Sequence, residues 1–133
     1  ETMNAYASAV RFYQHNDIDT ASPVHLVVLL YDGAIRFFRL SAKAQAEGKK
    51  DQARDYLLRA EKIILELLCT LNLEKGGEIA QNLADLYRFI IGRCGTLNDE
   101  NYGKVIEENC RLLAGLRESW AQIERASDGR ESR

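Results

Sequence analysis

The sequence predicts an all-α fold: an antiparallel up-down four-helix bundle with a short N-terminal segment that is helical or extended. Composition is the first reason, because the 133 residues include one proline and nine glycines, too few for a turn-rich β architecture. With 46% apolar and 29% charged residues, we expect one domain that buries about two-thirds of its unfolded surface. Periodicity is the second reason, since apolar residues recur at three- and four-residue spacing in four segments separated by short breaks.

Capping residues and glycines predict where the first two helices begin and end. Ser22 is a favourable N-cap, and Pro23 fits the first turn of a helix, where its missing N–H is harmless. Gly48 is expected to stop this first helix. The second helix is expected to begin with Asp51 as its cap and to end near Leu73.

A glycine pair separates the second helix from the third. Gly76-Gly77 is expected to break the chain, because glycine is unfavourable in a helix interior. The third helix then runs from Glu78 to about Cys94.

The last helix is expected to open at Asn98 or Asp99 and to run to about Ala126, followed by a small, polar tail at 127–133 that we expect to be disordered. Because all the connections are short, successive helices are expected to lie antiparallel as neighbours.

Three of the helices carry one apolar stripe that is expected to form the core. The stripe positions are Ala53, Tyr56, Leu57, Ala60, Ile64, Leu67 and Leu71 in the second helix, Ile79, Leu83, Leu86, Ile90 and Cys94 in the third, and Val105, Leu112, Leu113, Leu116, Trp120 and Ile123 in the last.

The first helix is apolar on two nearly opposite sides, whereas a helix in a four-helix bundle buries one face. Surplus apolar surface in a small soluble protein indicates a partner-binding site. Irregular packing of the bundle, or cover by the N-terminal segment, would explain the same pattern. The expected partner-binding residues are Leu26, Leu30 and Phe37 on the first helix, Leu58, Leu65 and Cys69 on the second, Phe89 and Ile91 on the third, and Ile106 and Cys110 on the fourth.

The N-terminal segment, residues 4–19, has its own amphipathic pattern in Tyr6, Ala9, Val10 and Tyr13. A helix of this length is not stable alone in water. We therefore expect it to fold against a groove, either as a permanent part of the core or as a plug, with Tyr6, Val10 and Tyr13 as the contacting residues.

Catalytic, cofactor and metal chemistry are not indicated by the residues present. The two histidines, His15 and His25, belong to no Glu-x-x-His pair, the motif with which di-iron bundles hold their metals. The three cysteines, Cys69, Cys94 and Cys110, show no C-x-x-C spacing. We therefore predict that the protein is not an enzyme and has no cofactor or metal site. The cysteines are expected to lie in helices, as free thiols of a protein in the reducing cytoplasm.

Charge and hydropathy limit the kinds of partner. A net charge of −2 argues against nucleic acid or an anionic membrane as the general partner. No apolar run approaches the roughly 18 residues of a membrane span, so no membrane insertion is expected. On the first helix, Asp32 and Arg36 have the spacing of an i,i+4 ion pair.

Three stretches of sequence together resemble a known family. They are Thr20-Ala-Ser-Pro23 followed by Leu30-Tyr-Asp-Gly-Ala-Ile35, then Glu74-Lys-Gly-Gly-Glu-Ile-Ala80 with Asn82-Leu83 and Leu86-Tyr87, and finally Leu116-Arg-Glu-Ser-Trp120. In order and spacing, from Met3 to about Ile123, the chain is similar to the FliS family of flagellar secretion chaperones.

The resemblance implies a cytoplasmic helical bundle that binds newly made flagellin. Members of the family hold the C-terminal segment of flagellin, which is disordered in the monomer, prevent its premature polymerisation and deliver it to the flagellar type III export apparatus. The resemblance also implies further flagellar regulators, such as an anti-sigma factor, as partners. From the residues alone, a helical structural adaptor that forms homo-oligomers through its surplus apolar face is the alternative.

Overall fold

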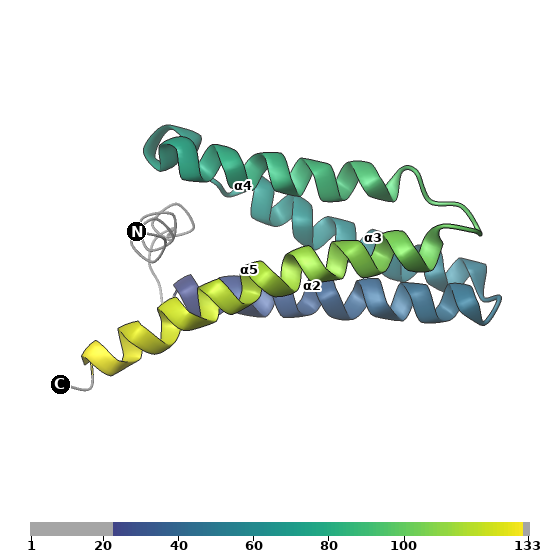
Figure 1. Ribbon diagram of the computed structural model, residues 1–133, viewed down its shortest axis with the longest axis horizontal. Coiled ribbons are helices and arrows are strands. Elements are labelled where there is room, and N and C mark those ends of the chain that lie inside the picture. The colour runs from purple at the N-terminus through teal and green to yellow at the C-terminus, as the bar shows by residue number, and fades with distance from the viewer. Residues whose placement is uncertain (1–22, 132–133) are drawn as a thin grey trace.

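The computed structural model describes the backbone of residues 23–131 and the side chains of residues 24–126. Over this range it contains four α-helices and no strand: α2 (Pro23–Ala46), α3 (Lys50–Cys69), α4 (Leu73–Cys94) and α5 (Tyr102–Glu131). Figure 1 shows successive helices running alternately to the right and to the left. The predicted all-α helical fold is confirmed. The N-terminal segment 4–19, with Tyr6, Val10 and Tyr13, lies outside the described residues.

The start of α3 differs from the expected one. Its N-cap is Lys49, whose side chain makes no capping hydrogen bond, so the prediction that Asp51 caps this helix was wrong. The turn before it is tight, because Gly48 has a φ of 76° and the Lys49 amide donates to the Ala44 carbonyl at 2.9 Å. The helix therefore begins early and leaves Asp51 in its first turn, where a carboxylate favours the positive end of the helix dipole.

The junction between α3 and α4 also lies earlier than predicted. Helix α3 ends at Cys69, and Asn72 caps α4 by accepting the Lys75 amide on its side-chain oxygen at 3.0 Å. The predicted break at Gly76-Gly77 is therefore a kink inside α4. Gly77 has φ 55° and ψ −136°, a conformation that glycine adopts without the steric cost of a Cβ atom.

Helix α5 begins after a turn in which the Asn98 side chain accepts the amides of Glu100 and Asn101, both at 2.9 Å. It continues past Ala126, its expected end, to Glu131. The tail predicted at 127–133 overlaps the end of this helix, and its disorder stays a prediction.

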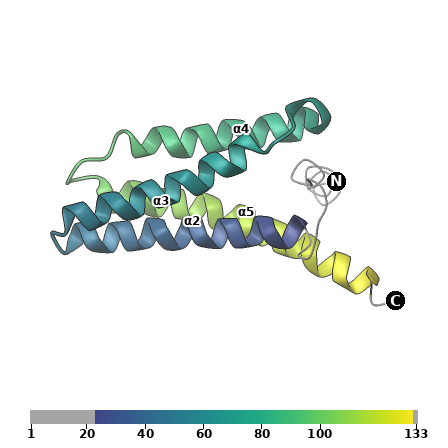
Figure 2. The ribbon, with the colours of Figure 1, turned by 180° about the vertical axis from the view of Figure 1, so that it is seen from behind.

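Helix α2 packs against both α3 and α5, and Figures 1 and 2 agree in placing α4 on the far side of the molecule from α2. Gly33 permits the close approach to α3, since a Cβ atom there would lie 3.2 Å from Cδ1 of Ile63. At the other end, the buried Ser41 hydroxyl donates to the Ala53 carbonyl at 2.7 Å and lies 2.7 Å from the Tyr102 hydroxyl. Because serine has a single hydroxyl proton, Tyr102 is the donor in that second bond.

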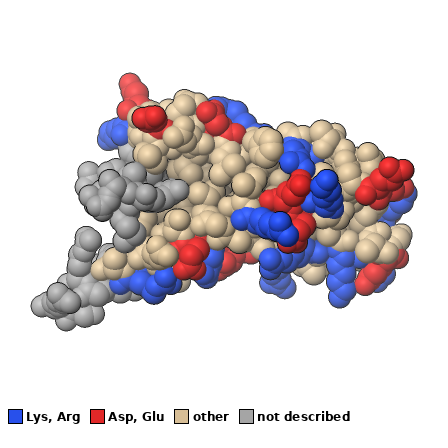
Figure 3. Space-filling model, in the orientation of Figure 1, with Lys and Arg blue, Asp and Glu red and all other residues tan. Residues whose placement is uncertain are grey.

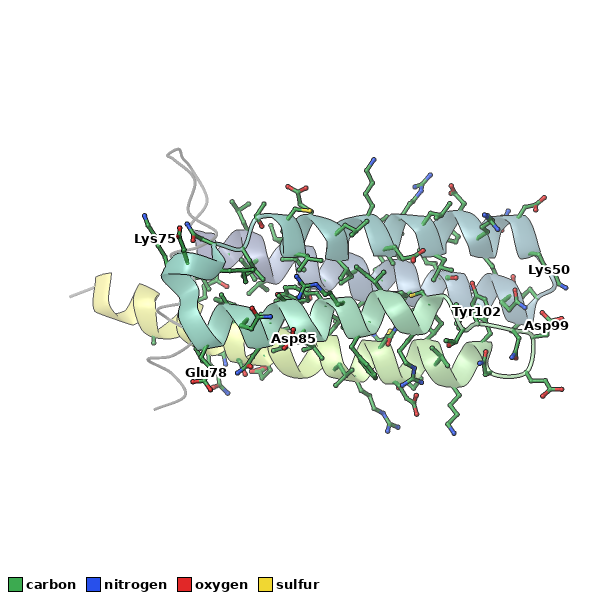
Figure 4. All side chains as sticks on the ribbon, turned by 90° about the horizontal axis from the view of Figure 1, so that it is seen from above. Lys50, Lys75, Glu78, Asp85, Asp99 and Tyr102 are labelled. Atoms are coloured by element: carbon green, nitrogen blue, oxygen red, sulfur yellow. The ribbon has the colours of Figure 1, made fainter. Side chains whose placement is uncertain are left out.

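The two ends of the bundle are distinct in Figure 4. Lys50, Asp99 and Tyr102 lie together at the end formed by the α2–α3 and α4–α5 connections, and Lys75 and Glu78 lie at the opposite end. Lys50 and Asp99 form an ion pair of 3.4 Å across that first end.

The predicted core is confirmed at most positions and wrong at one. Leu112 is 37% exposed, whereas Ile106 and Cys110, which we expected outside the core stripe, are 1% and 0% exposed. Helix α5 contacts both α2 and α4, so its buried face is wider than one stripe and includes these two residues. The predicted core residues that are buried are Ala53, Ala60, Ile64, Leu67, Leu83, Ile90, Cys94, Val105, Leu113, Trp120 and Ile123, whereas Tyr56, Leu57, Leu71, Ile79, Leu86 and Leu116 are partly buried.

Candidate functional site

A buried hydrogen-bonded cluster joins three helices at the centre of the molecule. Tyr31 of α2, Tyr87 of α4 and Trp120 of α5 are all fully buried. The Trp120 indole N–H donates to the Tyr31 hydroxyl at 3.1 Å, and the hydroxyls of Tyr31 and Tyr87 lie 2.5 Å apart. Each of these residues comes from one of the three sequence stretches that carry the family resemblance. Each of those stretches therefore contributes one side chain to a cluster in the interior of the fold.

Two of the same stretches also supply an ion pair between α2 and α5, formed by Asp32 and Arg117. The Arg117 guanidinium donates two hydrogen bonds to Asp32, at 2.8 and 3.3 Å, and this partner raises the pKa of Arg117. The sequence-based prediction that Asp32 pairs with Arg36 was wrong, because Arg117 of the neighbouring helix offers the bidentate geometry that a carboxylate prefers. A second contact, His25 Nδ1 to Glu124 Oε2 at 2.6 Å, joins the same two helices nearer the start of α2.

The outer face of α3, defined by Leu58, Leu65 and Cys69, is the clearest exposed apolar surface predicted from the sequence. Leu58 is 53% exposed, Leu65 is 46% exposed, and Cys69 is exposed at the end of the same helix. The two leucines are seven residues apart, so they lie on one side of the helix at about 10 Å from each other along its axis. This spacing fits an amphipathic partner helix.

A second apolar region lies on the outside of α4 and α5. Phe89 of α4 is half exposed, and the Arg93 guanidinium lies over its ring, 5.5 Å from the centroid. Arg93 also forms an ion pair with Glu108 of α5, and this hydrogen bond lowers the pKa of Glu108. In Figure 3 the surface between α4 and α5 is uncharged to the left of a central group of charged side chains.

The structure removes two residues from the predicted surface. Ile106 and Cys110 are in the core, packed between α5 and its neighbours, so their placement on a partner-binding surface was wrong. Burial raises the pKa of the Cys110 thiol to about 11 and that of Cys94 to about 12. Neither thiol is positioned to react with a partner.

Three other predicted residues are partly covered. Leu30, Phe37 and Ile91 pack against the core at its edge. Phe37 stacks on Tyr56 of α3, with ring centroids 6.2 Å apart, and the Arg59 guanidinium lies 5.8 Å from the Phe37 centroid. The second apolar side of α2 therefore packs largely against α3. Leu26, at the start of α2, remains half exposed.

Sequence reasoning missed exposed leucines on three helices. Leu29 of α2 and Leu73 of α4 are 50% and 43% exposed, and Leu112 was assigned to the core. Leu29 lies one turn after Leu26, so its spacing was a signal available in the sequence.

The described residues contain neither a cluster of metal-binding side chains nor a helix that could span a membrane. Across residues 24–126, no three His, Cys, Asp or Glu side chains gather closely enough to hold a metal ion. None of the helices within residues 23–131 has the length and hydropathy needed to cross a membrane.

Comparisons with known proteins point to one family. The family model described as flagellar protein FliS matches residues 4–127. The flagellar secretion chaperone FliS of Salmonella typhimurium is 34% identical over 132 residues, which cover 96% of this chain and 98% of that protein. Proteins with the same name from Campylobacter jejuni and Bacillus subtilis are 33% and 30% identical, over 86% and 83% of this chain and 90% and 81% of their own lengths.

Proposed function

The chain belongs to the FliS family of flagellar proteins, and we propose that it is a cytoplasmic export chaperone for flagellin. In this proposal it binds the C-terminal segment of flagellin, the client, prevents its premature polymerisation and delivers it to the flagellar type III export apparatus. The name of its relatives, flagellar secretion chaperone, supports the class of function. The observation that carries the proposal is the distribution of exposed leucine and phenylalanine side chains over all four described helices.

The energetics favour a client that contacts more than one helix. Complete burial of a leucine side chain contributes about 1.5–3 kcal/mol, so a half-exposed leucine offers roughly half of that. The two leucines of the outer α3 face would then offset only the cost of ordering a disordered segment, about 2–5 kcal/mol. A client that also covers Leu26 and Leu29 on α2 and Phe89 on α4 would gain enough additional free energy from apolar burial to exceed that ordering cost.

The proposed activity is binding and involves no catalysis. An amphipathic client helix placed on the outer α3 face would bury apolar residues at i, i+3, i+4 and i+7 against Leu58 and Leu65. Holding the client through affinity alone needs no nucleotide, and the export apparatus would supply its release.

Replacing Leu58 or Leu65 with Asp tests the proposal. Either change is expected to weaken binding of purified flagellin by about 1–3 kcal/mol, because a carboxylate would be desolvated where a leucine was covered. Titration calorimetry measures the affinity, and circular dichroism is expected to show unchanged helicity. Flagellin without its C-terminal segment is expected not to bind the wild-type protein.

Three controls make this test decisive. Leu58→Lys is expected to behave like Leu58→Asp, because the loss of apolar contact and not the sign of the charge weakens binding. Ile64→Ala and Leu67→Ala, in the buried stripe of α3, are expected to cost about 2–5 kcal/mol of stability. Unchanged flagellin affinity in both Asp variants, or a collapse of their melting temperature, would contradict the assignment of this surface.

Size-exclusion chromatography separates the proposal from the structural adaptor that forms homo-oligomers. A monomer at working concentration leaves the exposed leucines available to a client. A stable oligomer that dissociates in the Leu58→Asp variant would support the adaptor instead.

A further inference from the structure

Helix α2 carries a strip of three cations on its solvent-facing side, Arg36, Arg39 and Lys43. Their spacing of three and four residues places them on one line along the helix. Together with Asp32, Ile35 and Leu40 they line a shallow hollow of about 380 Å³. Figure 3 shows Lys and Arg side chains projecting along the lower edge of the molecule, where α2 lies in Figure 1.

Within residues 24–126, no carboxylate neutralises the charge of the strip. Asp32, the carboxylate within the hollow, is held by Arg117 through both of its oxygens. Among residues 24–126, none of the ion pairs includes a member of the strip, although eight other Lys and Arg side chains have acidic partners. The Arg39 guanidinium lies near the Cys110 thiol, which is uncharged at neutral pH because burial raises its pKa to about 11.

The neighbours of the strip are apolar. Ile35 is buried and Leu40 is partly buried on the two sides of the cationic line, so the hollow has apolar walls beside a positive centre. On a chain with a net charge of −2, three cations within two helical turns that have no acidic partner among residues 24–126 make a local positive field. The strip thus favours a ligand with carboxylates in the middle and apolar side chains beside them.

We propose that this strip is a docking site for an acidic amphipathic helix of a second protein, distinct from the flagellin client. Carboxylates at i, i+3 or i+4 and i+7 of such a helix would face Arg36, Arg39 and Lys43, and its apolar side chains would cover Ile35 and Leu40. Nucleic acid fits less well, because three charges form a small electrostatic footprint and the apolar walls leave no aromatic platform for bases. The strip shares no residue with the outer α3 face, on which the flagellin client is proposed to dock.

The test uses the full chain and a short synthetic helical peptide that carries Glu at i, i+3 and i+7 beside leucines, labelled for fluorescence anisotropy. The strip variant is R36Q/R39Q/K43Q. The matched control, R54Q/K62Q/K75Q, removes the same number of charges from cations that also have no ion-pair partner among the described residues. We expect the peptide affinity to fall roughly tenfold in the strip variant and less than about twofold in the control, since each exposed pair contributes modestly.

Two further measurements define the site. A peptide with Gln in place of Glu is expected not to bind, and amide NMR shifts on titration of the wild-type protein are expected to concentrate in residues 32–43. The strip variant is expected to keep its affinity for flagellin, so failure of this proposal is distinguishable from failure of the chaperone proposal.

Three results would overturn the inference. One is equal loss of peptide binding in the strip and control variants, which would indicate a general charge effect. The second is a set of amide shifts outside α2 and its neighbours. The third is binding of phosphatidylglycerol vesicles that depends on the strip while the Glu peptide does not bind, which would make the partner a membrane.

Discussion

The buried cluster of Tyr31, Tyr87 and Trp120 and the outer face of α3 place large side chains in opposite environments. The cluster joins three helices and satisfies its polar atoms internally, whereas Leu58 and Leu65 on the outer face are about half in contact with solvent. All three cluster residues belong to the stretches that resemble the FliS family, and neither leucine does. Each family-like stretch therefore contributes a residue to the interior, and the two leucines of the outer α3 face lie outside those stretches.

This difference has a physical reason. A buried hydroxyl or indole N–H is costly unless it is hydrogen-bonded, so the partners in such a cluster depend on one another. An apolar binding surface requires only leucine-like side chains at helical spacing, and many sequences satisfy that condition. A motif search therefore finds the interior of such a protein more readily than its binding surface.

Trp120→Ala is the change expected to have the largest effect. It removes a fully buried aromatic side chain and leaves the Tyr31 hydroxyl without its donor, so we expect a loss of about 3–5 kcal/mol in the free energy of unfolding. Urea unfolding followed by circular dichroism measures it. Leu65→Ala on the outer face is the matched control and is expected to cost less than about 1 kcal/mol. Equal losses in the two variants would show that the two regions do not differ as described.

The sequence predicted the helices better than their ends. The four helical segments and most of the buried stripes were confirmed because periodicity reports burial directly. The junction between α3 and α4 was misplaced, since Asn72 was not considered as a cap and Gly77 permits a kink in place of a break. Glycine composition alone does not distinguish these two outcomes.

The candidate surface was predicted only in part, for a geometric reason. Leu58, Leu65 and Phe89 point away from the core on their helices and are exposed as predicted. Ile106 and Cys110 lie close to the core stripe of α5, and the direction of a neighbouring helix decides whether such a position is covered. Sequence periodicity predicts the centre of a buried helix face, whereas the width of that face depends on how the neighbouring helices pack.

The three cysteines provide a second contrast between surface and interior. Cys69 on the outer face is expected to react rapidly with iodoacetamide, whereas Cys94 and Cys110 are expected to react only after unfolding, because they are buried and their pKa values are raised. Mass spectrometry of the labelled peptides measures the three rates. Bound flagellin is expected to slow labelling of Cys69 if the client covers that face. Rapid labelling of Cys94 or Cys110 in the folded protein would contradict the core assignment.

The buried thiols of Cys94 and Cys110 make the free energy of unfolding depend on pH in the alkaline range. Below about pH 8 the thiols are protonated in both the folded and the unfolded protein, so they contribute no pH dependence. Above that pH the unfolded chain releases thiol protons, while burial keeps Cys94 and Cys110 protonated until their pKa values of about 12 and 11. Stability is therefore expected to fall as pH rises from about 8 to about 11, measured by urea unfolding. The Cys110→Ala variant is expected to show a smaller fall; an identical fall would assign the effect to other groups.

The smallest expected effect concerns residues 4–18, for which we keep the sequence-based prediction of an internal plug. Tyr6, Ala9, Val10 and Tyr13 repeat at helical spacing, and tethering gives such a segment an effective concentration of order millimolar beside exposed apolar surface. A plug that covers the client surface part of the time lowers the apparent affinity for flagellin, so deletion of residues 4–18 is expected to tighten binding by about two- to fivefold and to increase self-association. Hydrogen exchange distinguishes the plug from a permanent core element. A plug loses protection when flagellin binds, because the client displaces it, whereas a core element keeps its protection, and a deletion that unfolds the bundle would rule out the plug.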